Sequence, residues 1–295
     1  MTVFPGKIGI VLITAVDDGG WGTAGYKGIQ ALQTQAGVEI EVRDQTPLGQ
    51  AQQVFTDLSK RGCSLVFGHG GELSDAIRRA AEDTPQVMFA CTNGLYTTRN
   101  LAALEIKDEE VAYLAGILAG RVSAMQRVGF IGGLEICATL RHNYGYQKGA
   151  LETGVDLTTC YTRDFFDPSK AKRAAERLID QQVDVIYGYL NTAWQGVVEA
   201  CRDTNCKVIE PIMDRGSGNP AVIASAVQNV GALYVRAAHL FAEGTLEGRR
   251  YRIGVEDPSV QQLALHLSDA ALTAEIEATR ARILKHEIES LPNSH

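Results

Sequence analysis

Residues 7–32 read KIGIVLITAVDDGGWGTAGYKGIQAL and combine the two signals from which the fold can be inferred. The opening apolar run, residues 7–13, is typical of a strand buried on both faces of a parallel sheet. Residues 25–35 have the apolar spacing of a helix. Residues 17–25 lie at the expected passage from strand to helix and hold two acids, a tryptophan and four glycines.

The alternation of short apolar strands and amphipathic helices continues to residue 106. This pattern indicates βαβ crossovers and therefore a doubly wound parallel sheet. After the first strand and helix, the expected strands are 38–44, 63–70, 86–93 and 100–106, and the expected helices are 48–62 and 71–84.

The pattern then restarts, which predicts an internal duplication. Residues 59–83, SKRGCSLVFGHGGELSDAIRRAAED, match residues 179–203, IDQQVDVIYGYLNTAWQGVVEACRD, element for element. Such self-similarity indicates two α/β lobes in tandem. In the second half the expected helices are 108–122, 140–154, 168–182 and 193–204, and the expected strands are 127–134, 156–165, 183–190 and 207–214.

Residues 221–257 are too short for a third domain and are predicted to form a strand, a long helix and another strand that complete both sheets. The chain would then cross between the lobes near residues 107, 229 and 247. The predicted N-terminal lobe is 1–106 plus 229–246, and the predicted C-terminal lobe is 107–228 plus 247–295.

Composition narrows the function classes. The 295 residues include 28 basic and 35 acidic side chains, a formal net charge of −7, without a long basic run, so a nucleic-acid partner is not expected. No stretch approaches the roughly 18 to 20 apolar residues of a membrane span, and the first residues lack the features of a secretory signal. As written, the chain is predicted to be soluble and cytoplasmic, whereas a removed leader would make it periplasmic or a lipoprotein.

Cysteine and histidine positions favour no metal site and no cofactor. The six cysteines are scattered through apolar segments without a CxxC pair, and the six histidines are dispersed. Buried, reduced thiols are therefore expected. A bridge within the segment CRDTNC, residues 201–206, stays possible.

In open α/β sheets, ligands bind outside the carboxyl ends of the strands. Aromatic, amide and acidic residues recur in the loops at these ends, and two lobes facing each other would form a cleft. The candidate ligand-binding residues are Asp17, Trp21, Tyr26, His69, Asn93, Phe166, Asn191, Trp194 and Asp214.

Each candidate has a structural alternative. Asp17 or Asp18 fits a helix cap, and Trp21 fits a hydrophobic contact between strand and helix. Asparagine is also common in turns, so the alternative for Asn93 and Asn191 is to hold a turn. In the structural alternative for His69, its ring nitrogens form hydrogen bonds with backbone groups. One residue of the pair Phe165 and Phe166 is expected to belong to the core.

Ordered motifs from about residue 7 to about residue 275 resemble the basic membrane protein (BMP) family of substrate-binding proteins. They are VDDGGWGTAGYKG, EVAYLAGILAG, RVGFIGGLEI, GYQKGA, FFDPSKAKRAAERLIDQQVDVIYGYLN, SAVQNV and FAEGTLEG. The resemblance implies the type I periplasmic-binding-protein fold and a receptor for purine nucleosides that serves an ABC importer. DDGGWGTAGYKG, VFGHG and SAVQNVGALYV are most similar to the Med-like branch, named for a positive regulator of competence.

Two departures from the nucleoside receptors stand out. Those receptors typically read Asp-Asp-Lys-Ser-Phe-Asn where this chain has residues 17–22, so Trp21 retains the aromatic side chain and Gly22 lacks the amide. They usually carry a ligand-binding lysine in place of Gln228. Its replacement removes a charge-assisted contact of about 1.5 to 3 kcal/mol, and Gln228 joins the candidate residues.

The favoured function is therefore a receptor that closes a two-lobe cleft on a nucleobase or nucleoside, with an ABC permease as possible partner. A planar ligand would stack on Trp21 and on Phe166 or Trp194, with Asp17 and Asp214 as acceptors. One alternative is a cytoplasmic Med-like regulator that acts through a protein partner. The other, an enzyme acting on nucleosides, is disfavoured because G-x-S-x-G, P-loop and G-x-G-x-x-G motifs are not found at the expected positions.

Overall fold

The structure is a computed structural model that describes residues 6–215, 218–288 and 291. The chain divides into two compact units. The first lobe comprises residues 1–106 and 229–253, and the second lobe comprises residues 107–228 and 254–295. The chain therefore passes between the lobes three times.

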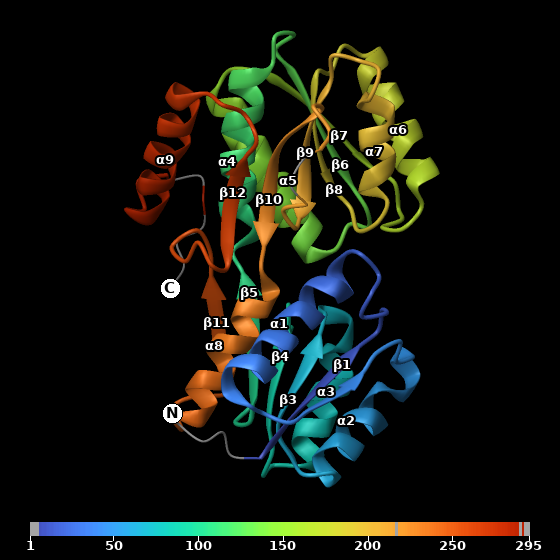
Figure 1. The fold of residues 1–295 in the computed structure, drawn as a ribbon, viewed down its shortest axis with the longest axis vertical. Helices are drawn as coiled ribbons and strands as arrows, with labels where there is room; N and C mark the ends of the chain where they lie inside the picture. Colours follow the sequence, from blue (N-terminus) through green and yellow to red (C-terminus); the bar gives the residue numbers. More distant parts are fainter. Residues whose placement is uncertain (1–5, 216–217, 289–290, 292–295) are drawn as a thin grey trace. The chain divides into compact units, whose positions relative to one another are not determined.

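The first lobe is a six-stranded parallel sheet in the order β11-β5-β4-β3-β1-β2. Helices α1 and α8 pack together on one face, and α2 and α3 cover the other (Figure 1). Its elements are β1 (Lys7–Leu12), α1 (Trp21–Ala36), β2 (Ile40–Arg43), the 3₁₀ turn η1 (Leu48–Gln50), α2 (Ala51–Lys60), β3 (Cys63–His69), the 3₁₀ turn η2 (Gly71–Leu73), α3 (Ser74–Asp83), β4 (Met88–Thr92), β5 (Leu101–Ile106), α8 (Val230–Ala242) and β11 (Arg250–Ile253).

The second lobe repeats this plan with the order β12-β10-β9-β8-β6-β7. Helices α4 and α5 cover one face, and α6 and α7 cover the other. Its elements are α4 (Asp108–Val122), β6 (Arg127–Gly132), α5 (Cys137–Glu152), β7 (Asp156–Tyr161), α6 (Pro168–Asp180), β8 (Val185–Tyr189), α7 (Trp194–Cys201), β9 (Lys207–Ile212), β10 (Val222–Gln228), β12 (Gln261–Leu265) and α9 (Ala270–Leu284).

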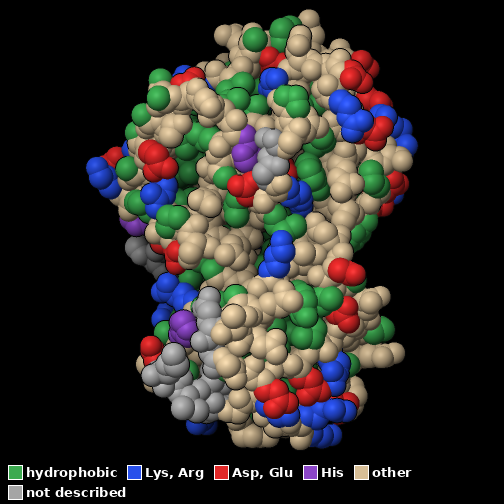
Figure 2. All heavy atoms as spheres, viewed as in Figure 1, with side chains coloured by type: hydrophobic (Ala, Val, Ile, Leu, Met, Phe, Trp, Pro, Cys, Tyr) green, Lys and Arg blue, Asp and Glu red, His purple; other side chains and the backbone are tan. Residues whose placement is uncertain are grey.

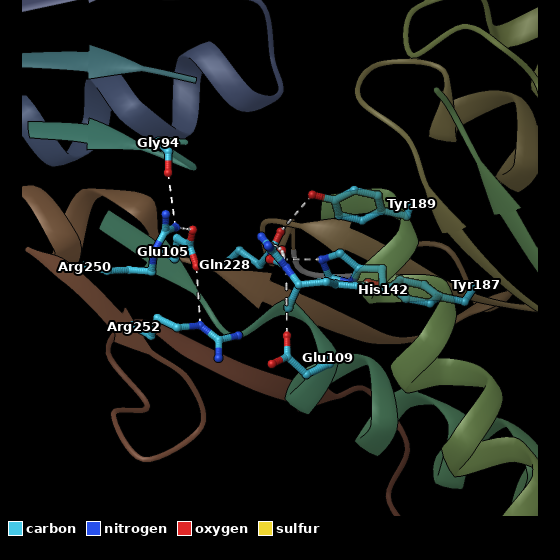
Figure 3. Close-up of polar contacts among 11 residues, drawn as sticks. Gly94, Glu105, Glu109, His142, Tyr187, Tyr189, Gln228, Arg250 and Arg252 are labelled. Carbon is cyan, nitrogen blue, oxygen red and sulfur yellow. Dashed lines mark hydrogen bonds and ion pairs between the residues drawn. The ribbon is translucent and has the colours of Figure 1, made fainter. Parts of the chain in front are cut away.

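The lobe boundary after α8 differs from the one drawn from the sequence. Residues 247–253 belong to the first lobe because β11 pairs in parallel with β5. Glu105 on β5 is almost buried and forms ion pairs with both Arg250 and Arg252 of β11, the second at 3.4 Å. Arg250 also donates a hydrogen bond to the Gly94 carbonyl at 3.2 Å (Figure 3). These contacts hold β11 at the edge of the first sheet.

Two elements of the second lobe were not expected from the sequence. Strand β12 runs antiparallel to β10, so this sheet is mixed rather than purely parallel. Helix α9 follows it and packs against α4. No helix among the described residues is long and apolar enough to cross a membrane.

In both lobes a glycine allows two helices to pack closely, α1 on α8 and α5 on α4. A Cβ on Gly28 of α1 would come within 2.0 Å of the Gly231 backbone in α8. A Cβ on Gly149 of α5 would come within 2.1 Å of the Tyr113 carbonyl oxygen in α4. Glycine is required at these crossings because any side chain would collide with the backbone of the partner helix.

Candidate functional site

The carboxyl edge of the first sheet lies where β1, β3 and β4 end. Asp17 is exposed in the loop after β1, and Trp21 is half-buried at the start of α1, with half-buried Tyr26 further along that helix. Asn93 follows β4 with a φ of 54°, a left-handed conformation that asparagine tolerates. Because parallel strands end at the same edge, Asp17, Trp21 and Asn93 belong to one edge of this lobe.

Asp18, not Asp17, organises the loop before α1. Its carboxylate accepts hydrogen bonds from three backbone N–H groups, those of Gly20 at 2.8 Å, Thr23 at 3.0 Å and Gly22 at 3.1 Å. A carboxylate at this position satisfies N–H groups that the first turn of a helix leaves unpaired. Asp18 therefore has the capping role that the sequence offered as an alternative for either acid.

His69 ends β3 and is buried. Its Nε2 lies 2.9 Å from the Trp21 carbonyl oxygen, which can only accept, so Nε2 carries the proton. Nδ1 then accepts from the Tyr234 hydroxyl at 2.5 Å. Burial lowers the pKa of His69 to about 4, with weaker opposing contributions from the Trp21 hydrogen bond and Asp18. The imidazole is thus neutral and has a partner at each nitrogen.

The Trp21 ring stacks on His69, with ring centroids 4.7 Å apart and an interplanar angle of 20°. A ligand that stacks on Trp21 would have to take the opposite face of the indole. The stack on His69 corresponds to the structural alternative for Trp21, and its role as a ligand contact stays a prediction.

In the second lobe, Phe165 and Phe166 differ in exposure, but neither is a core residue, because Phe165 is only half-buried. The Phe165 ring packs so closely on Gly133 that a Cβ there would come within 2.2 Å of it. Phe166 is 52% exposed in the loop between β7 and α6. Asp167 then caps α6 through two backbone N–H groups, and Pro168 begins the helix. Phe166 is therefore an aromatic side chain presented to solvent at the carboxyl edge of the second sheet.

Asn191 and Trp194 lie between β8 and α7. Asn191 is buried, and its carbonyl oxygen accepts a hydrogen bond from the Trp194 backbone at 3.4 Å. The Arg215 guanidinium lies 4.5 Å from the centre of the Trp194 ring. The indole also packs against the core cluster beneath α6 and α7. One face of Trp194 is thus covered by a cation–π contact, so Phe166 is the more accessible of the two aromatic candidates.

Asp214 is exposed after β9 and lies 3.6 Å from Nε2 of His266. Together with Glu210 these residues can each place one ligand atom within 4.8 Å of the other two, as a metal site requires. However, buried Glu210 already accepts hydrogen bonds from the Ser225 hydroxyl at 2.5 Å and the Arg215 backbone at 3.1 Å. The Arg215 guanidinium at 3.5 Å adds a positive charge, so this group is better described as an internal polar network.

Gln228 ends β10 and is buried in a second polar network (Figure 3). Its Nε2 donates to Asp108 at 2.6 Å and lies 3.0 Å from Nε2 of His142. Its Oε1 accepts from the Tyr189 hydroxyl at 3.5 Å. Since an amide nitrogen only donates, Nε2 of His142 accepts, and its Nδ1 donates to the Tyr187 hydroxyl at 2.9 Å.

Arg141 completes this network from α5. Its Nε and Nη2 donate to the same carboxylate oxygen of Asp108, at 2.9 and 2.7 Å. Glu109 lies 4.0 Å from the Arg141 Nε. Burial alone would lower the pKa of Arg141, but attraction and hydrogen bonding by Asp108 raise it above its usual value. The guanidinium is therefore held as a cation beside a buried carboxylate.

The sequence reasoning missed Arg141, His142 and Asp108. The first two lie in the helix after β6, which is the counterpart of the helix after β1 that holds Trp21 and Tyr26. Applying the internal duplication to this loop and helix would have placed Arg141 at the carboxyl edge of the second sheet. No pattern in the sequence points to Asp108 as a site residue, because it lies 33 residues before its partner Arg141.

On the face shown in Figure 2, Lys and Arg side chains are interspersed with Asp and Glu rather than gathered into one basic surface. The two α/β lobes, each with polar and aromatic residues at the carboxyl ends of its strands, have the architecture that is typical of two-lobe ligand-binding proteins. Residues 6–293 match the family model described as ABC transporter substrate-binding protein PnrA-like, abbreviated Bmp. The chain belongs to this family.

Related proteins and structures agree with this assignment. The transcriptional activator protein Med of Bacillus subtilis is 27% identical over 84% of this chain and 79% of its own length. A purine-binding protein of Brucella abortus is 22% identical over 96% of this chain and 82% of its own length.

Two solved structures share the fold. A transcriptional activator of the comK gene from Bacillus halodurans superposes with a TM-score of 0.86 and 22% identity, over 98% of this chain and 100% of the other. A solute-binding protein of an ABC transporter system from Conexibacter woesei superposes with a TM-score of 0.79 and 21% identity, over 96% and 97%.

Proposed function

We propose that this protein is the ligand-binding component of an ABC importer and that its ligand is a nucleobase or nucleoside. The observation that carries the proposal is the family match, which extends over almost the whole chain. The purine-binding relative supports the ligand class. The protein would bind its ligand and release it chemically unchanged to an ABC permease.

The side chains at the two carboxyl edges suit an aromatic ligand with polar substituents. Trp21 offers an indole in the first lobe, and exposed Phe166 offers a phenyl ring in the second. Stacking on such rings contributes about 0.5 to 1.5 kcal/mol beyond the burial of apolar area. Asp17 and Asp214 are exposed acceptors for ring N–H groups or sugar hydroxyls. The remaining candidates, Tyr26, His69, Asn93, Asn191, Trp194 and Gln228, stay predictions as ligand contacts.

A thermal-shift panel followed by calorimetric titration tests the proposal. Nucleobases and nucleosides should raise the melting temperature more than sugars or amino acids do, because a ligand stabilises the folded state by RT ln(1 + [L]/Kd). A response restricted to sugars or amino acids would contradict the ligand class. Chromatography of the recovered ligand distinguishes a binding protein from an enzyme, since an enzyme would return altered product.

A second candidate function is a ligand-sensing regulator that acts through a protein partner. The similarity to Med, a transcriptional activator protein by its name, favours it. Uptake of a labelled nucleoside by cells that lack the gene separates the two functions. Loss of uptake is expected for the importer, whereas unchanged uptake with altered transcript levels is expected for the regulator.

A further inference from the structure

We propose that Arg141 contacts the ligand directly and binds an uncharged oxygen acceptor, a hydroxyl or carbonyl group, through the N–H groups that Asp108 leaves unused. The inference rests on the proposed function and assigns a specificity-determining role to a residue of the second lobe. Three properties of this guanidinium support the inference: its unused donors, its fixed orientation and the charge around it.

The Arg141 guanidinium retains donors for a ligand. A guanidinium has five N–H donors, and in this structure Nε and Nη2 each donate to Oδ2 of Asp108. Nη1 has no hydrogen bond or ion pair to any residue that the structure describes. The side chain is 28% exposed, compared with 3% for Asp108. A ligand at the carboxyl edge can therefore reach the arginine but not the carboxylate.

The network behind Arg141 fixes its orientation. Asp108 begins α4, and its second carboxylate oxygen accepts from Gln228 at 2.6 Å. Gln228 is held in turn by His142 and Tyr189. Because the carboxylate is held from both sides, the planar guanidinium is preorganised, and less conformational entropy is lost when it binds an acceptor. Gln228 is thus a positioning residue, with its amide nitrogen turned to Asp108 and His142.

The surrounding charge favours a neutral acceptor over an anion. Asp108 and Glu109 each carry a formal negative charge beside the single positive charge of Arg141, and both side chains are 3% exposed. In a site of low dielectric constant, this surplus of negative charge repels a phosphate or carboxylate. A hydroxyl or carbonyl oxygen accepts from Nη1 without that penalty. The network therefore discriminates nucleosides and bases from their phosphorylated forms.

The test uses the full chain and two substitutions, Arg141→Met and Arg141→Lys, with Arg121→Met as matched control. Arg121 lies in the same lobe and pairs with Glu275 at 2.7 Å, on the surface between α4 and α9. Titrations use adenosine, guanosine, their free bases, their 2′-, 3′- and 5′-deoxy forms and their 5′-monophosphates. Arg141→Met should weaken nucleoside binding by about 10- to 100-fold, the range of a hydrogen bond to a charged donor, and Arg121→Met should leave it unchanged.

The ligand deletions keep the inference testable even where Arg141→Met folds poorly. For the ligand oxygen that Arg141 contacts, deletion should weaken binding to the wild-type protein and to Arg121→Met more than binding to Arg141→Lys, because a lysine ammonium lacks the planar donor geometry that Asp108 fixes. Circular dichroism verifies that each variant is folded. Equal affinities of wild-type and both Arg141 variants for every probe would overturn this inference alone. Failure of the wild-type protein to bind any base or nucleoside would overturn the proposed function and this inference with it.

Discussion

Each lobe carries a stacked ring pair in which a helix side chain lies on a residue at the end of a strand. In the first lobe, Trp21 at the start of α1 stacks on His69 at the end of β3, with ring centroids 4.7 Å apart. In the second lobe, His142 of α5 stacks on Tyr189 at the end of β8, with centroids 3.8 Å apart. Helix α1 corresponds to α5, and strand β3 corresponds to β8. In both lobes, therefore, an aromatic side chain of the helix stacks on the residue that ends the strand.

The groups behind the two stacks differ in charge. His69 is tied to neutral partners, the Tyr234 hydroxyl and the Trp21 carbonyl oxygen, and it carries its proton on Nε2. His142 accepts at Nε2 from Gln228, which binds the Asp108 carboxylate. His69 at a strand end and His142 on a helix thus adopt opposite tautomers. We infer that the first lobe presents a neutral aromatic surface and that the second lobe presents a fixed cation in addition to exposed Phe166.

The largest expected effect is in the charged network of the second lobe. Asp108→Ala removes the carboxylate to which the Arg141 guanidinium and Gln228 donate. It leaves Arg141 with the more distant Glu109 at 4.0 Å. The loss should be about 4 kcal/mol, as for other buried charge pairs broken on one side. Urea unfolding measures it, with Glu275→Ala as control, because that carboxylate pairs with Arg121 at the surface. Equal losses in the two variants would show that the network contributes no more than a surface ion pair.

The neutral stack of the first lobe should be sensitive to acid. Burial lowers the pKa of His69 from 6.5 to about 4. The unfolded chain therefore binds a proton between these values that the folded protein does not, so stability falls as pH falls from about 6.5 to about 4. The loss should reach about 3 kcal/mol, at 1.36 kcal/mol for each pKa unit.

Comparison of wild-type protein with His69→Gln isolates this effect. The variant should be less stable at pH 7 and should lack the part of the pH dependence that comes from His69. Denaturant unfolding at several pH values between 7 and 4 gives both quantities. Parallel pH profiles for the two proteins would mean that another group causes the acid sensitivity.

The fold was largely predictable because strand and helix segments have distinct periodicity. The elements that were missed differ in how much signal they contain. In α9, Leu272, Ile276 and Ile283 are buried at helical spacing, and the pattern was readable. In β12, Gln261–Leu265, buried and exposed residues do not alternate as they would in a strand with one buried face. The position of this strand is set by its antiparallel pairing with β10. Pairing between distant strands leaves little trace in such a short segment.

The candidate site was predictable only in part. Loop positions follow from the order of strands and helices, which is why Trp21 and Phe166 were placed at carboxyl edges. The burial of a polar side chain depends on its partners, and those are distant in sequence: Gln228 binds Asp108, 120 residues earlier, and His69 binds Tyr234, 165 residues later. A single sequence does not reveal such pairs. Sequence alone therefore could not tell which polar side chains are committed to internal networks.

Trp21→Ala tests the neutral aromatic surface and should weaken nucleoside binding by about 2 kcal/mol, the combined effect of stacking and apolar burial. The hydrogen bond from His69 goes to the backbone carbonyl of residue 21 and survives the substitution. Since the ring is half-buried, the loss of stability should be smaller than the roughly 3 to 5 kcal/mol of a fully buried tryptophan. Calorimetry and urea unfolding on the same variant measure both. A large loss of stability with unchanged affinity would eliminate the stacking role.

The smallest effect on stability is expected for Phe166→Ala, which tests the matching aromatic position in the second lobe. Phe166 is 52% exposed, and Phe165 supplies the packing on Gly133. Removing its ring should therefore change the free energy of unfolding by less than about 0.5 kcal/mol. If the ring stacks on the ligand, affinity should fall by about 1 kcal/mol. Phe165→Ala is the matched control, because its ring packs on Gly133 and its removal should lower stability more than it lowers affinity. If Phe166→Ala binds nucleosides as tightly as the wild-type protein, the aromatic contact belongs to the first lobe alone, and the second lobe contributes only polar groups.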